Sequence, residues 1–147
     1  MESLVVKEHV SQVVYISRAA PSVTSVVLDE LLAKARVFNT EHGLTGFLTY
    51  DGTSFCQLLE GPQQTLDALM ERIERDRRHD SIYPIWSAVG ERFLPYWSMH
   101  HERLDSADEY VREQVSMLLD RQGERGPTRE QIKQLVLRMK LESVKRR

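Results

Sequence analysis

Residues 52–62, GTSFCQLLEGP, place an amide where a buried strand is expected. The apolar run from Phe55 to Leu59 is typical of a strand that is covered on both faces, yet Gln57 lies in its middle. A buried amide without a hydrogen-bond partner costs about 2–7 kcal/mol. The fold must therefore supply partners for Gln57 or use it for chemistry.

Turn and helix signals on both sides place this run in a hairpin between two helices. Residues 44–50, LTGFLTY, form a second strand-like run, and Asp51-Gly52 between the two runs favours a hairpin. Upstream, a helix is expected over residues 24–43, with Gly43 as its stop and with apolar residues at helical spacing: Val27, Leu28, Leu31, Leu32, Ala35 and Phe38. Downstream, Gly61-Pro62 opens a second helix that ends near residues 76–80 and carries one apolar face: Leu66, Leu69, Met70 and Ile73.

Three further strand-like runs complete the order βαββαββ: residues 11–17, 82–90 and 95–104. In the first run, Val13, Tyr15 and Ser17 share one face, and Val14 and Ile16 share the other. Two helices of this length favour an α+β ferredoxin-like sandwich, in which both helices lie on one face of the sheet.

The other sheet face then needs a cover, and the C-terminal residues can provide it. Ser106 with Glu109 and Thr128 with Gln131 stand in capping-box register, each at the start of a helical pattern, with a short linker at residues 121–127 between the helices. We therefore expect a domain over residues 1–103 and a helical extension over residues 104–147, which packs on the sheet or forms an output or oligomer surface.

Composition is that of one soluble globular domain: 147 residues, 41% hydrophobic and 29% charged, with a net charge of −2. This charge gives no whole-molecule reason to expect nucleic acid or a membrane surface as a partner. The single cysteine, Cys56, is expected to be a buried thiol in a reducing compartment. Residues 1–10 do not have the pattern of a signal peptide, and no apolar stretch reaches about 18 residues, so we expect a cytoplasmic protein without a membrane span.

Several separated motifs together resemble the BLUF domain, the flavin-binding blue-light sensor. They are Tyr15, Asn39, GLTGFLTYDGTSFCQLLEGP at residues 43–62, RIERDRRH at residues 72–79 and RFLPYWSM at residues 92–99. The resemblance covers residues 11–103 and implies that FAD lies with its ring between the two helices. It implies contacts to the flavin from one set of residues: Tyr15, Leu31, Asn39, Gln57, Arg72, Asp76, Arg78 and His79. It also implies that Leu28, Leu31, Leu32 and Ile73 sandwich the ring.

The resemblance further implies a photoactive group and a non-enzymatic switch. Tyr15 would pass an electron and a proton to the excited flavin, and Gln57 would be left with a rearranged hydrogen-bond pattern after they return. Trp97 and Met99, two residues apart in an expected strand, would share a face, so that either could approach Gln57 and move the last strand. Three departures from the family pattern are Cys56, Phe38 and the MHH sequence at residues 99–101.

The same residues also have ordinary structural interpretations. Tyr15, Trp97 and Met99 fit core packing, and Arg72, Asp76 and Arg78 fit a solvated helix face. The histidines do not predict a metal site, because adjacent strand residues such as His100 and His101 point to opposite faces.

The output is expected to be an unidentified downstream protein, because a cyclase, phosphodiesterase or DNA-binding domain of conventional size has no room after residue 103. The final helix has a wide apolar surface that favours homo-oligomers. Two alternatives stay open. One is a nucleic-acid binder that uses the basic residues of segment 128–147, and the other is a light-insensitive protein-interaction module.

Overall fold

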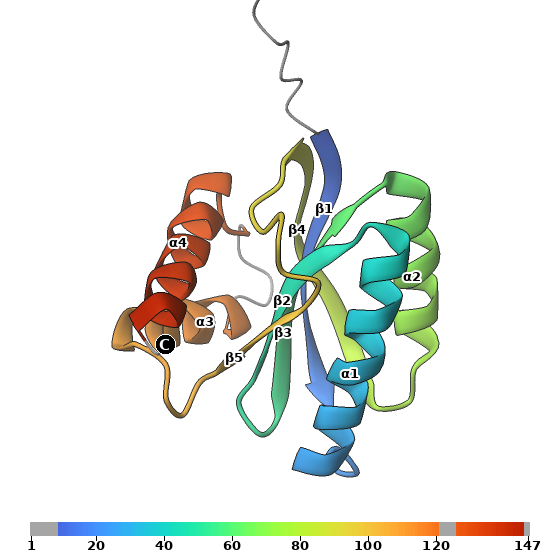
Figure 1. Cartoon of the computed structure of the whole chain (residues 1–147). Coiled ribbons are helices and arrows are strands. Elements are labelled where there is room, and N and C mark those ends of the chain that lie inside the picture. Colours follow the sequence, from blue (N-terminus) through green and yellow to red (C-terminus); the bar gives the residue numbers. More distant parts are fainter. Residues whose placement is uncertain (1–8, 121–125, 146–147) are drawn as a thin grey trace, which may run out of the picture.

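The computed structural model describes residues 9–120 and 126–145 and contains one mixed sheet between two layers of helices (Figure 1). The elements follow in the order β1 His9–Ala19, α1 Ser25–His42, β2 Thr45–Tyr50, β3 Ser54–Gly61, α2 Gln63–Arg75, β4 His79–Glu91, β5 His100–Arg103, α3 Glu109–Leu119 and α4 Arg129–Lys145. The α+β ferredoxin-like order βαββαββ expected from the sequence is confirmed.

The strands lie in the order β4-β1-β3-β2-β5. All neighbours are antiparallel except β2 and β5, which run parallel. Helices α1 and α2 cover one face of the sheet, and α3 and α4 cover the other (Figure 1). Both faces of the central strands are therefore buried, which explains why β3 has apolar residues on both faces: Phe55 and Leu59 on one, Cys56 and Leu58 on the other.

Each face of the sheet contributes to its own hydrophobic core. Alternate residues of β1 separate as expected: Val13 and Tyr15 pack with the core under α1 and α2, whereas Val14 and Ile16 pack with the core under α3 and α4. Helix α1 ends where Gly43 adopts a left-handed φ of 70° and donates its N–H to the carbonyl of Asn39. This end fixes where Asn39 lies relative to the sheet.

The C-terminal helices begin differently from one another. Thr128 and Gln131 form the expected capping box at α4, with backbone-to-side-chain distances of 2.8 and 3.2 Å. The expected box at Ser106 is wrong, because Asp108 caps α3 by accepting a hydrogen bond from the N–H of Tyr110. An aspartate side chain nearer the helix provides this cap, and the Ser106 hydroxyl donates to the carbonyl of Arg103 instead.

Two predicted boundaries also need correction. Helix α2 ends at Arg75, so Asp76 caps it, Arg78 lies in the following turn and His79 begins β4. The last strand begins at His100 instead of residue 95, so Trp97 and Met99 lie in the segment that connects β4 to β5. The expectation that these two side chains share one strand face is therefore wrong.

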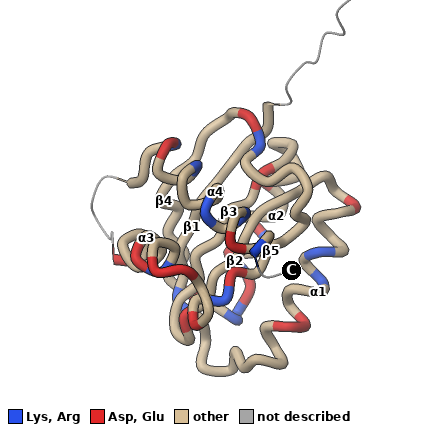
Figure 2. Tube along the Cα trace, turned by 60° about the vertical axis from the view of Figure 1, so that its left-hand side comes forward, with Lys and Arg blue, Asp and Glu red and all other residues tan. Residues whose placement is uncertain are grey.

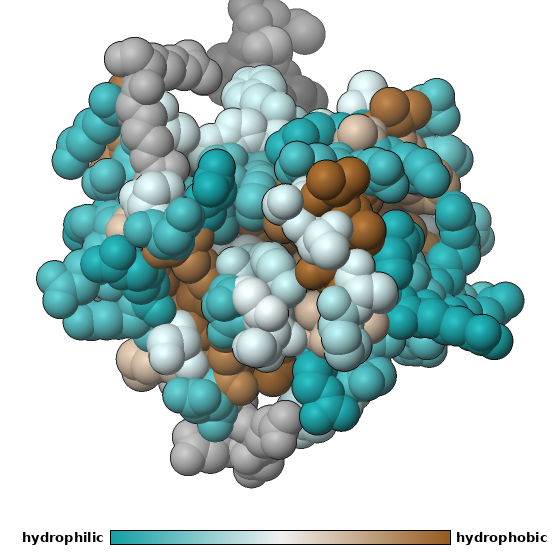
Figure 3. All heavy atoms as spheres, turned by 90° about the horizontal axis from the view of Figure 1, so that it is seen from below, coloured by the Kyte–Doolittle hydropathy of each residue, from teal (hydrophilic) through white to brown (hydrophobic). Residues whose placement is uncertain are grey.

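Charges of both signs are interspersed along the chain trace (Figure 2), in keeping with the small net charge. Seen from below, hydrophobic surface appears as separate patches between hydrophilic residues (Figure 3). Within the described residues, no helix has the length and hydrophobicity needed to cross a membrane. Most of the expected linker, at residues 121–125, and the basic residues Arg146 and Arg147 lie outside the described residues.

Candidate functional site

A cavity of about 240 Å³ opens between α1, α2 and the sheet. Its walls include apolar side chains such as Leu31 from α1 and Ile73 from α2, and its floor includes residues of β1 and β3. Of the residues expected to touch or respond to a flavin, ten line this cavity: Tyr15, Leu31, Asn39, Gln57, Arg72, Ile73, Asp76, Arg78, His79 and Met99. The tertiary structure thus gathers residues from five separate stretches of sequence around one cavity.

Trp97, Leu28 and Leu32 do not line the cavity. The ring of Trp97 stacks on that of His100, with 4.1 Å between centroids, and packs against the core on the α3 and α4 side. Leu28 and Leu32 lie in the core beneath α1 instead of lining the cavity. Leu31 and Ile73 are the two members of the expected apolar sandwich that reach it.

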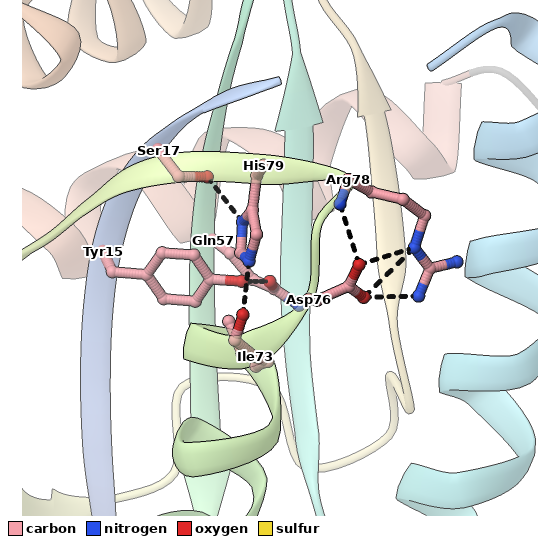
Figure 4. A network of polar contacts seen from close by, with 7 residues as sticks. All are labelled: Tyr15, Ser17, Gln57, Ile73, Asp76, Arg78 and His79. Carbon is pink, nitrogen blue, oxygen red and sulfur yellow. Dashed lines mark hydrogen bonds and ion pairs between the residues drawn. The ribbon is translucent and has the colours of Figure 1, made fainter. Parts of the chain in front are cut away.

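Two hydrogen bonds on the floor of the cavity explain how the Gln57 amide can be buried. Tyr15 and Gln57 are register partners in the β1–β3 ladder, and the Tyr15 hydroxyl donates a hydrogen bond to Oε1 of Gln57 (Figure 4). On its other side, Nε2 of Gln57 donates to Sδ of Met99 at 3.7 Å. The amide therefore lies between a phenol and a soft, weak acceptor.

Burial sets the protonation of the groups around Gln57. It raises the pKa of the Tyr15 phenol well above its usual range, and Cys56 and Asp76 add smaller contributions in the same direction. Tyr15 is therefore a neutral hydrogen-bond donor at physiological pH. Burial also raises the pKa of the Cys56 thiol to about 12, and this side chain packs in the core on the opposite sheet face.

A polar cluster from the end of α2 and the start of β4 forms part of the cavity lining (Figure 4). Arg78 forms a forked ion pair with Asp76, with N–O distances between 2.5 and 3.1 Å. The hydrogen bond from Arg78 lowers the pKa of Asp76 despite partial burial. His79 joins three elements, with Nε2 at 2.6 Å from the Ile73 carbonyl and Nδ1 at 3.0 Å from the Ser17 hydroxyl. Because a carbonyl only accepts, Nε2 carries a hydrogen.

Asn39 and Arg72 complete the lining from the two helices. Asn39 is buried near the end of α1, and its Nδ2 donates to the carbonyl of Ser98 at 2.6 Å. The guanidinium of Arg72 lies over the ring of Phe38, 4.9 Å from its centroid. Phe38, which removes a polar group expected from the family pattern, is thus both a cavity wall and a support for Arg72.

Sequence reasoning missed several lining residues, including Lys34 and Leu48. Helical spacing offered a signal for Lys34, because residues 31, 34, 35 and 38 lie on one face of α1. The strand residue Leu48 gave no such signal, since its position depends on strand pairing. Within the described ranges, no group of three His, Cys, Asp or Glu residues is arranged to hold a metal.

The cavity suits a planar heteroaromatic ring with a polar edge. Its volume falls just below the range of about 300–1,000 Å³ usual for whole-ligand pockets, which fits a ring system whose remaining parts extend outside. The amides of Asn39 and Gln57 can supply both donors and acceptors to the carbonyl and N–H groups of such an edge. The fold and this donor set fit the class that the sequence motifs resemble, a flavin-binding sensor domain.

Comparisons with known proteins agree with that class. Residues 10–100 match the BLUF family model, described as sensors of blue-light using FAD. The chain belongs to the BLUF family and is a flavin-based blue-light sensor. The photoreceptor interpretation is therefore favoured over the nucleic-acid-binding and light-insensitive alternatives.

Relatives and solved structures extend the comparison. The dark-state structure of BlrB, a BLUF protein, has a TM-score of 0.73 and 28% identity, and the match covers 92% of this chain and 98% of that one. The photoactivated adenylate cyclase subunit beta of Euglena gracilis is 32% identical over 80 residues, which is 54% of this chain and 9% of that protein. The blue light- and temperature-regulated antirepressor BluF of Escherichia coli K12 is 34% identical over 55 residues, covering 37% of this chain and 14% of the relative. This chain thus spans only a small part of the curated relatives it matches.

Proposed function

We propose that the cavity binds the isoalloxazine ring of FAD and that Tyr15, Gln57 and Met99 form a light-operated hydrogen-bond switch. The observation that carries the proposal is the continuous line from the Tyr15 hydroxyl through the Gln57 amide to the Met99 sulfur on the cavity floor. When bound, the flavin supplies blue-light absorption and a transient electron acceptor.

Binding and orientation fall to the cavity walls and to its polar ends. Leu31 and Ile73 would hold the faces of the ring, and Asn39 would fix its carbonyl and N–H edge against Gln57. The Arg78–Asp76 pair, His79 and Arg72 would close the site around the ring. FAD is proposed over FMN on the family description, since the cavity accounts for the ring alone.

The switch itself is a change in donor and acceptor positions. Tyr15 gives up an electron and its hydroxyl proton after light absorption, and that proton can move along the hydrogen bond to Oε1 of Gln57. Rotation or tautomerisation of the amide during the return leaves Gln57 with a different set of partners. A stronger hydrogen bond from Gln57 to the flavin edge would shift the flavin absorption to the red. Electron and proton return to Tyr15, so the cycle has no net chemistry and the proposed domain is not an enzyme.

The proposed output leads through residues 92–103 to the C-terminal helices. Rearrangement of Gln57 changes its contact with Met99, and β5 follows directly after Met99. In this proposal residues 1–103 sense light, and residues 104–147 present the result to an unidentified downstream protein.

Homo-oligomers and a cytoplasmic location belong to the same proposal. Helix α4 buries four apolar residues on the sheet side, while Leu137, Leu141 and Val144 are exposed on its outer side. Their spacing of four and three residues forms an apolar stripe that a second subunit could cover. The free thiol of Cys56 fits a reducing compartment.

Absorption spectroscopy of the FAD-loaded protein tests the switch. We expect a small red shift under blue light that reverses in the dark, and its loss in Tyr15→Phe and Gln57→Leu while flavin stays bound. Tyr83→Phe and Gln64→Leu are matched controls, because both residues are exposed and neither lines the cavity. An unchanged red shift in Tyr15→Phe would show that Tyr15 is not the electron donor.

A further inference from the structure

The segment connecting β4 to β5, residues 92–99, is held at both ends by buried side chains. At the cavity end, Gln57 donates to Sδ of Met99 and Asn39 donates to the carbonyl of Ser98. At the other end, the backbone N–H groups of Phe93 and Leu94 donate to the carboxylate of Glu60 at 2.9 and 2.7 Å. Because the segment is short, a displacement of Met99 can also displace Phe93.

Glu60 is fully buried and receives two hydrogen bonds on each carboxylate oxygen. Oε1 accepts from Phe93 N–H and from Nε2 of Gln12 at 2.9 Å. Oε2 accepts from Leu94 N–H and from the Thr45 hydroxyl at 3.1 Å. A buried carboxylate depends on such donors for its stability, so displacement of one donor affects the remaining ones.

The Glu60 side chain lies on the sheet face opposite the flavin cavity. Gln12 and Glu60 are register partners in β1 and β3, three residues away from the Tyr15–Gln57 pair in each strand. An odd offset reverses the direction of a strand side chain. The same two strands therefore carry one polar pair toward the cavity and another toward α3 and α4.

Gln12 continues this connection to the first residue of α4. Its Oε1 accepts a hydrogen bond from Arg129 at 3.0 Å. The Arg129 guanidinium lies over the rings of Trp86 and Phe93, 5.1 and 5.4 Å from their centroids. Gly90 leaves room for this group, since a Cβ there would come within 2.5 Å of it.

We propose that Glu60 is a positioning residue that couples segment 92–99 to the start of α4 through Gln12 and Arg129. This inference rests on the proposed function, because the rearrangement of Gln57 supplies the movement of Met99. Phe93 carries the coupling in two ways: its N–H is bound to Glu60, and its ring lies under Arg129. A displaced Phe93 therefore changes two contacts: its hydrogen bond to Glu60 and its ring contact with Arg129 at the start of α4.

The test is light-dependent hydrogen exchange of the α4 backbone in the FAD-loaded full chain. Glu60 itself stays unchanged, because replacing a fully buried carboxylate endangers folding. Gly90→Ala displaces the flexible guanidinium of Arg129 without replacing any residue of the connection, and Arg129→Met removes the guanidinium. The matched control is Arg138→Met, since Arg138 also holds α4 through an ion pair with Asp108 and a contact over the Tyr110 ring.

In the unchanged chain we expect α4 exchange to differ between dark and light. Gly90→Ala and Arg129→Met should keep the red shift but lose this difference, whereas Arg138→Met should keep both, even where its basal exchange rises. The coupling is overturned if α4 responds to light in Gly90→Ala and Arg129→Met, if Arg138→Met loses the response equally, or if the unchanged chain shows a red shift without any response. Absence of the red shift from the unchanged chain instead overturns the proposed function on which the coupling rests.

Discussion

At the scale of single residues, the proposed switch depends on how Tyr15 and Gln57 are buried. The phenol and the amide are 42 residues apart in sequence, yet they meet as register partners with one hydrogen bond between them. Burial keeps Tyr15 protonated, so its hydroxyl donates a hydrogen bond to Oε1 of Gln57. The Nε2 group of the same amide then donates to a separate acceptor, Sδ of Met99.

The raised pKa of Tyr15 predicts a loss of stability at alkaline pH. Below about pH 10 the phenol is protonated in both states; above it, only the unfolded phenol ionises, so the folded state binds more protons. Stability should then fall by at most about 1.4 kcal/mol per pH unit for this group. Urea unfolding at successive alkaline pH values should show a shallower decline in Tyr15→Phe.

Cys56 serves as the internal reference for that titration. Its pKa is raised to about 12 by burial from an ordinary value of 9.0, so its contribution begins about one unit lower and persists in Tyr15→Phe. Identical alkaline profiles for Tyr15→Phe and the unchanged chain would contradict burial of a protonated phenol in the folded state.

Met99 and Trp97 should differ in their effects on the switch. Met99→Leu removes the sulfur that accepts from Gln57, so we expect a changed rate of dark recovery after the red shift. Trp97→Phe should keep the red shift and a recovery rate near that of the unchanged chain, because Trp97 stacks on His100 outside the cavity. Time-resolved absorption of both FAD-loaded variants measures this; an effect of Trp97→Phe alone would reverse the assignment.

At the scale of elements, the two C-terminal helices depend on different caps. Thr128→Ala removes one half of the α4 capping box and should lower the free energy of unfolding by about 1 kcal/mol. Ser106→Ala should leave it nearly unchanged, since Asp108 is the cap of α3. Urea unfolding of both variants checks this. An equal loss of unfolding free energy in Ser106→Ala would show that Ser106, as the sequence predicted, caps α3.

At the scale of the whole molecule, the C-terminal helices share a core with the sheet. Helices α3 and α4 pack with the β1 and β3 side chains that point away from the cavity, including Val14, Ile16 and Leu58. Although the sequence suggests a boundary at residue 103, this shared core predicts a single cooperative transition for the full chain.

Two probes test that cooperativity. Helix content by circular dichroism and flavin release by fluorescence should follow the same urea curve, and a chain ending at residue 103 should aggregate because one sheet face is uncovered. A separate early transition in helix content alone would show that residues 104–147 unfold independently.

The sequence by itself determined the features that arise from local chemistry. Apolar alternation in β1 assigned Val14 and Tyr15 to opposite faces, Gly43 ended α1, and Thr128 with Gln131 opened α4. Turn residues, helical spacing and the family motifs likewise gave the order of the elements and most of the residues around the cavity. These signals involve residues close together in the sequence, so they can be recognised before strand pairing is known.

Only the tertiary structure decided which distant side chains meet. In the folded chain Met99 accepts a hydrogen bond from Gln57, whereas Trp97 stacks on His100. On the opposite sheet face, Gln12 is hydrogen-bonded to both Glu60 and Arg129. Nothing local marked Glu60 as a buried acceptor, because its donors come from β1, β2 and the segment after β4. Strand register and the packing of α4 fix such contacts, since both depend on residues far apart in the chain.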